Sequence, residues 1–160
     1  MSQQLNEKLP TMFEVLNTLQ TKSSKEDQLA YIKSCISKDK RIFEFLAFAL
    51  NPTYTMQLPD DEPPYIPSQF HIELAPVQLL HVSNKLHLLY DKNLKQYKKE
   101  EIFIQWLEQM SPEEAKIFIS VKDKNLNSLY PVIDDSFVCG LFGWDLAKYK
   151  ELKQKYQKKI

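Results

Sequence analysis

The side chains that most often carry acid–base or metal chemistry are few in this 160-residue sequence and do not form a set. The histidines His71, His81 and His87 show no i, i+4 pair and no accompanying cysteine and carboxylate ligands, which a zinc site needs. Asp60 to Glu62 places three acids in a row and could attract a divalent cation. Adjacent side chains beside prolines point in different directions, however, so this run is typical of a solvated loop. We therefore predict no metal site and no cofactor.

The two cysteines also give little sign of chemistry. Cys35 and Cys139 lie far apart and have no CxxC partner, so neither a disulfide framework nor a zinc site is expected. Cys35 shares the apolar face of a predicted helix with Leu29, Ile32 and Ile36, where a core thiol is expected. No neighbouring motif would activate a thiolate, so nucleophilic catalysis is not indicated. Two buried thiols suit a reducing compartment.

Lysines interleaved with tyrosines offer another kind of chemistry, the neutralisation of phosphate. One group lies in residues 91–100, a pair formed by Lys122 and Lys124 follows a predicted helix, and the largest group lies in residues 144–160. The lysines of the first and last groups are Lys92, Lys95, Lys98 and Lys99, and Lys148, Lys150, Lys153, Lys155, Lys158 and Lys159. Such lysines form solvated helix faces more often than binding sites, and both interpretations stay open.

The composition restricts the fold and the class of partner. There are 21 lysines and arginines against 21 aspartates and glutamates, which excludes a uniformly basic nucleic-acid-binding protein but not a local basic face. Only two glycines are present, Gly140 and Gly143, which excludes the glycine-rich loops that bind phosphate or dinucleotides. Few glycines also disfavour the hairpin turns of an all-β protein. The composition therefore favours an all-α fold.

The length is that of one ordinary domain. No apolar run approaches the roughly 20 residues that span a bilayer, and the first residues lack the pattern of a signal peptide. We therefore expect a cytoplasmic protein with no membrane contact. Its single compact helical domain should cover residues 1–143, followed by a lysine-rich C-terminal helix or tail over residues 144–160.

Capping and periodicity signals predict six to eight helices around one core. Thr11 and Glu14 have the spacing of a capping box and begin the first helix, while Ser24 and Asp39 can cap the second and the third. The third carries apolar residues on several faces and is expected at the centre of the core. Four further helices are expected at about 76–90, 102–110, from Ser111 to about 121, and at 134–141.

Residues 51–67 contain five prolines, which block both helix and central strand and predict a long loop. Tyr54, Met56, Tyr65 and Ile66 are expected to pack onto the helices and to hold the loop in place. A loop of this length is either a surface strap that covers the core or a functional segment.

Two segments resemble the all-helical N-terminal DNA-binding domain of ATP-dependent phage DNA ligases. Residues 12–34, MFEVLNTLQTKSSKEDQLAYIKS, are similar to its opening, and residues 115–137, AKIFISVKDKNLNSLYPVIDDSF, are similar to the helix and Arg/Lys-Asp-Leu loop near its end. The chain also resembles small uncharacterised proteins of T4-like tailed phages and cyanophages. These share the MFEVLN helix, a PPYxP segment (residues 63–67) and a loop that contains KDKxL (residues 122–126) within Ile119 to Leu126.

The ligase resemblance implies DNA binding without catalysis. The Lys-x-Asp-Gly motif that carries ligation is absent, and the glycine of the ligase loop is replaced by residues 127–130 here. By the resemblance, one contacting loop would present Lys122, Lys124, Asn125, Asn127 and Ser128, and a helix N-terminus with Ser23, Ser24 and Lys25 would face phosphate.

We therefore expect a non-enzymatic phage accessory protein that binds duplex or nicked DNA through its phosphate backbone in the infected host cell. The alternative is a helical protein-interaction module that targets a phage or host replication, transcription or defence protein. The Lys-Asp loop and the C-terminal lysines favour DNA, whereas the zero net charge and the missing glycine favour the alternative. An enzyme or a virion component is the third interpretation.

Overall fold

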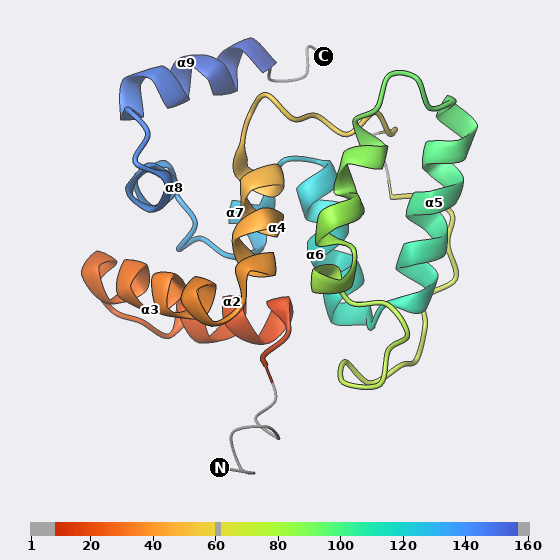
Figure 1. Ribbon diagram of the computed structural model, residues 1–160, viewed down its shortest axis with the longest axis horizontal. Helices are drawn as coiled ribbons and strands as arrows, with labels where there is room; N and C mark the ends of the chain where they lie inside the picture. The colour runs from red at the N-terminus through yellow and green to blue at the C-terminus, as the bar shows by residue number, and fades with distance from the viewer. Residues whose placement is uncertain (1–8, 60–61, 157–160) are drawn as a thin grey trace.

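The computed structural model of the protein describes residues 9–59 and 62–156. All regular structure in these residues is helical, as predicted, and the helices pack into one compact unit (Figure 1). The α-helices are α2 (Met12–Gln20), α3 (Lys25–Lys38), α4 (Lys40–Leu50), α5 (Gln96–Gln109), α6 (Pro112–Lys122), α7 (Leu126–Leu129), α8 (Asp135–Phe142) and α9 (Leu146–Tyr156). Two 3₁₀ helices, η1 (Leu79–His81) and η2 (Ser83–Leu89), lie between α4 and α5. No helix in the described ranges is long and apolar enough to cross a membrane.

Side-chain caps define where several helices begin. Thr11 and Glu14 form the predicted capping box at α2, with the Thr11 N–H donating to Glu14 Oε1 at 2.8 Å. Ser24 Oγ accepts the Asp27 N–H at the start of α3, and Ser111 Oγ accepts the Glu114 N–H at the start of α6. These bonds satisfy amides that have no partner within the helix.

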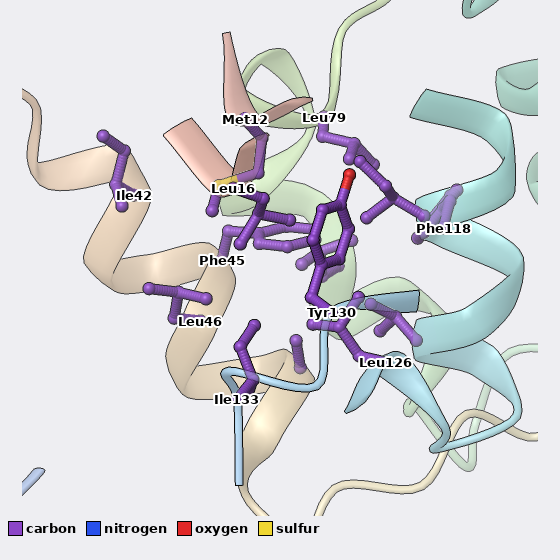
Figure 2. Packing of buried hydrophobic residues seen from close by; sticks show 14 of the residues in the cluster. Met12, Leu16, Ile42, Phe45, Leu46, Leu79, Phe118, Leu126, Tyr130 and Ile133 are labelled. Atoms are coloured by element: carbon purple, nitrogen blue, oxygen red, sulfur yellow. The ribbon is translucent and has the colours of Figure 1, made fainter. Parts of the chain in front are cut away.

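Helix α4 lies at the centre of the fold, where it was expected, and packs against α3, α6, η1 and η2. Its buried side chains meet those of α2, η1 and α6 in the core, where Leu16, Phe45 and Phe118 are shielded from solvent (Figure 2). Burial of such side chains stabilises the fold by roughly 1.5–3 kcal/mol each. The loop after α7 adds Tyr130 and Ile133 to the same core.

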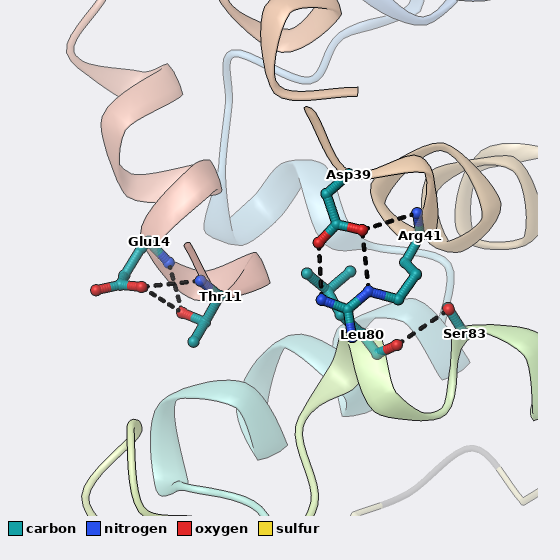
Figure 3. A network of polar contacts seen from close by, with 6 residues as sticks. All are labelled: Thr11, Glu14, Asp39, Arg41, Leu80 and Ser83. Carbon is teal, nitrogen blue, oxygen red and sulfur yellow. Dashed lines mark hydrogen bonds and ion pairs between the residues drawn. The ribbon is translucent and has the colours of Figure 1, made fainter. Parts of the chain in front are cut away.

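The expected α-helix at 76–90 is wrong, because this segment forms the 3₁₀ helices η1 and η2. The buried side chains Leu80, Ser83, Leu86 and Leu89 recur every three residues, the period of a 3₁₀ helix, whereas an α-helix would rotate them off one face. The buried Ser83 hydroxyl also donates to the Leu80 carbonyl at 3.1 Å, as Figure 3 shows.

Two other boundaries differ from the prediction. Helix α5 begins at Gln96, inside the basic segment that was expected to be a connector. The loop expected after α6 contains the short helix α7, which buries Leu126.

At the C-terminal end, α8 stops at Gly143, whose φ of 71° suits a residue without a side chain. Helix α9 then packs on α8 through Tyr149.

An ion pair between the buried carboxylate of Asp39 and the partly exposed guanidinium of Arg41 lies at the corner between α3 and α4. Asp39 follows the last residue of α3 and accepts the Arg41 N–H at the start of α4. The Arg41 guanidinium donates to both carboxylate oxygens of Asp39, at 2.9 and 2.8 Å (Figure 3). This two-point hydrogen bond is the main reason that the pKa of the Asp39 carboxyl is lowered.

The buried carboxylate of Glu114 joins three helices. It lies in the first turn of α6 and is 1% exposed. Its Oε1 accepts the Leu79 N–H of η1 at 2.8 Å, and its Oε2 accepts the Phe13 N–H of α2 at 3.2 Å. Burial raises the pKa of this carboxyl, while the backbone N–H groups oppose the rise.

Replacing Glu114 with alanine should lower the free energy of unfolding by about 2–4 kcal/mol, because two amides would lose their acceptor in a region closed to water. Denaturant unfolding followed by circular dichroism measures the change. The control is Glu44→Ala on an exposed face of α4, which should cost less than about 0.5 kcal/mol. Equal losses in the two variants would contradict the joining role of Glu114.

Candidate nucleic-acid interface

A groove of about 440 Å³ lies between α2, the first turns of α6, and α7. Helix α2 contributes Phe13, Asn17 and Gln20, α6 contributes Pro112, Glu113, Lys116 and Ile117, and Leu129 and Tyr130 close the third side. The bonds of Glu114 hold the first turn of α6 against α2, so the two walls have a fixed separation.

The lining of the groove is both apolar and polar. Tyr130 is buried and its hydroxyl contacts Asn17 Oδ1 at 3.3 Å, which orients both side chains. Burial is the main reason that the pKa of the Tyr130 hydroxyl is raised, and the negative Glu114 adds to it. Lys116 and Glu113 are exposed and carry opposite charges at the α6 wall. The groove therefore offers one cation, one anion, side-chain amides and apolar surface.

The turn between α2 and α3 holds the predicted residues Ser23, Ser24 and Lys25. Both serines are exposed, and Ser24 caps α3 with its side chain. Lys25 donates to Asp134 Oδ1 at 2.8 Å, so its charge is already paired at the protein surface. This turn follows Gln20, which lines the groove.

Asn125, Asn127 and Ser128 are exposed in and just before α7. Leu126 anchors this short helix in the core, and the Ser128 N–H donates to the Asn125 carbonyl at 2.9 Å. The next residue, Leu129, lines the groove. None of the predicted residues in the turn or the loop lines the groove itself, but each segment is close in the chain to a residue that does, Gln20 or Leu129.

Lys122 and Lys124 do not line the groove. The expectation that Lys122 lies in an exposed loop is wrong, because it is the last residue of α6 and is 3% exposed. Its Nζ donates to the Pro59 carbonyl at 2.7 Å and also pairs with Asp123. A buried ammonium needs such acceptors, and here they are a carbonyl of the proline-rich segment and the neighbouring carboxylate of Asp123.

Lys124 also faces the proline-rich segment. Its Nζ donates to the carbonyls of Asn51, at 3.2 Å, and Tyr54. Although Lys124 as a whole is exposed, desolvation of its amino group against this segment lowers the pKa to about 8. Lys99, which was grouped with the solvated lysines, is 2% exposed and donates to Gln57 Oε1. We call these three side chains, Lys99, Lys122 and Lys124, the lysine clasp, because together they hold residues 51–59.

The C-terminal lysines are distributed differently. Lys148, Lys150 and Lys155 are exposed on α9, whereas Lys153 donates to Asp135 Oδ1 at 2.7 Å. Lys158 and Lys159 lie outside the described residues. Helix α9 does not line the groove, so these lysines form a separate basic surface.

The structure also shows the surroundings of Glu62 and of the two cysteines. Asp60 and Asp61 lie outside the described residues, and Glu62 is exposed. Within residues 9–59 and 62–156, no group of histidine, cysteine and carboxylate side chains could hold a metal ion. Both cysteines are buried free thiols, which confirms the sequence interpretation.

Sequence reasoning missed Asn17, Gln20, Glu113 and Lys116. Each pair is spaced i, i+3 on its helix and therefore shares one helix face. This spacing was a usable signal for the polar positions. The two faces line one groove because of how α2 packs against α6. The local sequence pattern carries no information about that packing.

Comparison with known proteins identifies a family. The chain belongs to a family of unknown function, DUF6433, whose profile matches residues 15–128. The match runs from the fourth residue of α2 into α7 and contains Asn17, Gln20 and Lys116. No curated protein and no solved structure matches the chain.

The clasp makes a prediction about stability. Replacing Lys122 with alanine should lower the free energy of unfolding by about 2 kcal/mol, because the Pro59 carbonyl loses its donor and the packed side chain is removed. Lys116→Ala, an exposed lysine on the same helix, should cost less than about 0.5 kcal/mol. Thermal and denaturant unfolding measure both values. A Lys122→Ala variant as stable as the wild type would show that the clasp contributes nothing to the fold.

Proposed function

We propose that the protein is a non-enzymatic DNA-binding protein that holds duplex or nicked DNA through its phosphate backbone at the groove between α2, α6 and α7. One observation carries this proposal. The two segments singled out by the ligase resemblance, the turn at 23–25 and the loop at 125–128, are each close in the chain to a residue that lines the same groove, Gln20 and Leu129. The resemblance also suggests an accessory role in a phage-infected cell.

The chemistry of the groove suits contacts with a phosphate backbone. Lys116 supplies an exposed cation in the groove. Neutral donors of the kind that position a protein on DNA are exposed in the segments beside Gln20 and Leu129 in the chain: Ser23, Asn125, Asn127 and Ser128. The contact would rest on few charges, because the lysine clasp is engaged internally and Lys25 is paired with Asp134. DNA binding should therefore depend on salt with a modest slope.

A second candidate function, a protein-interaction module, is favoured by the apolar surface of residues 66–74. Ile66, Phe70 and Leu74 are 78%, 42% and 77% exposed. The backbone beneath them is held in place, since the Ile66 N–H donates to Glu108 Oε2 at 2.8 Å and the Ser68 hydroxyl donates to the Met110 carbonyl. The expectation that Ile66 packs onto the helices is wrong. Its N–H bond to Glu108 fixes the backbone at the surface, so the side chain is exposed. Ordered apolar side chains facing solvent are typical of surfaces that bind another protein.

A salt titration of DNA binding tests the first function. The affinity should be independent of sequence and should fall as salt rises, and Lys116→Ala should flatten the log–log slope by about 0.9, the value expected for one lost phosphate contact. Lys92→Ala, an exposed lysine in the loop before α5, is the matched control and should leave the slope unchanged. Fluorescence anisotropy with a labelled duplex measures the slopes.

Two results would count against DNA binding at the groove. Equal flattening by Lys116→Ala and Lys92→Ala would show that the contact is not located there. Absence of binding at physiological salt would remove the DNA function altogether and leave the interaction module as the better account.

A further inference from the structure

The groove has the chemistry of a nucleobase site. Phe13 and Leu129 give it apolar walls, and the amides of Asn17 and Gln20 can both donate and accept hydrogen bonds. A base presents the same combination, a flat apolar face and an edge of donors and acceptors. Amide side chains pair with adenine in this way, and a carboxylate such as Glu113 accepts from an exocyclic amino group.

The size and fixed shape of the groove agree with such a ligand. Its volume of about 440 Å³ falls within the range of small-molecule sites, about 300–1,000 Å³. The Tyr130 hydroxyl donates to the amide oxygen of Asn17, which leaves the amide nitrogen of Asn17 available as a donor. A phosphate alone would leave the apolar walls unused and would meet the negative Glu113.

We infer that this groove receives an unpaired base of DNA, while Lys116 contacts the phosphate of the same nucleotide. The inference rests on the proposed function and adds a substrate class to it. The protein would then prefer DNA with an extrahelical, mismatched or single-stranded base over a fully paired duplex, because an unpaired base costs less to remove from the stack. Residues 23–25 and 125–128 would hold the backbone on both sides.

The preference can be measured with two duplexes that differ only by one extra, unpaired 2-aminopurine. The protein should bind the duplex with the unpaired base at least about tenfold more tightly, and the fluorescence of 2-aminopurine should change on binding. Gln20→Ala and Leu129→Ala should reduce the preference below about threefold, because they weaken binding of the duplex with the unpaired base more than binding of the paired duplex. Gln105→Ala, an exposed glutamine on α5, is the matched control and should keep the full preference.

The outcomes separate this inference from the proposed function. Equal affinity for the two duplexes would overturn the base site while DNA binding stands. If neither duplex binds, the proposed function fails. Titration with free deoxyadenosine monophosphate then tests whether the groove binds a base in the absence of DNA. If the nucleotide binds and Gln20→Ala weakens that binding, the result would support a base site that acts without DNA. If the nucleotide does not bind, the base site is overturned.

Discussion

The arrangement of the groove depends on one buried carboxylate. Glu114 is closed to solvent in the first turn of α6 and accepts backbone N–H groups from α2 and η1. Burial disfavours a charge in that position, and these amides and the N-terminal end of α6 oppose that effect with positive partial charge. The bonds hold α2 beside α6, and the side chains on the facing surfaces of these helices, Asn17 and Lys116 among them, can line one groove.

Contacts between segments that are distant in sequence also explain why the candidate site was only partly predictable. The resemblance led to the turn at 23–25 and the loop at 125–128, which adjoin Gln20 and Leu129 of the groove in the chain, and also to Lys122 and Lys124, which contact residues 51–59 instead. Whether a lysine faces solvent depends on which carbonyls lie within reach of its Nζ. Here those carbonyls belong to residues 51–59, about 70 positions earlier in the chain, and a local sequence pattern carries no information about that contact.

The fold was more predictable where its determinants are local. The caps at Thr11, Ser24, Asp39 and Ser111 bind amides two or three residues away, so their effect can be inferred from the sequence. The 3₁₀ helices were missed because the three-residue period of buried positions was interpreted with the α-helical period. The exposure of Ile66 was missed because its backbone is held by Glu108, a residue distant in sequence.

Hydrogen–deuterium exchange of the protein with and without bound DNA tests most directly where DNA lies. Our account predicts slower amide exchange at residues 17–25, 113–117 and 126–130 on binding, with no change at residues 51–59, which the lysine clasp holds in both states. Protection confined to residues 51–59 or to α9, in a sample where DNA is shown to be bound, would contradict the groove as the DNA-binding surface.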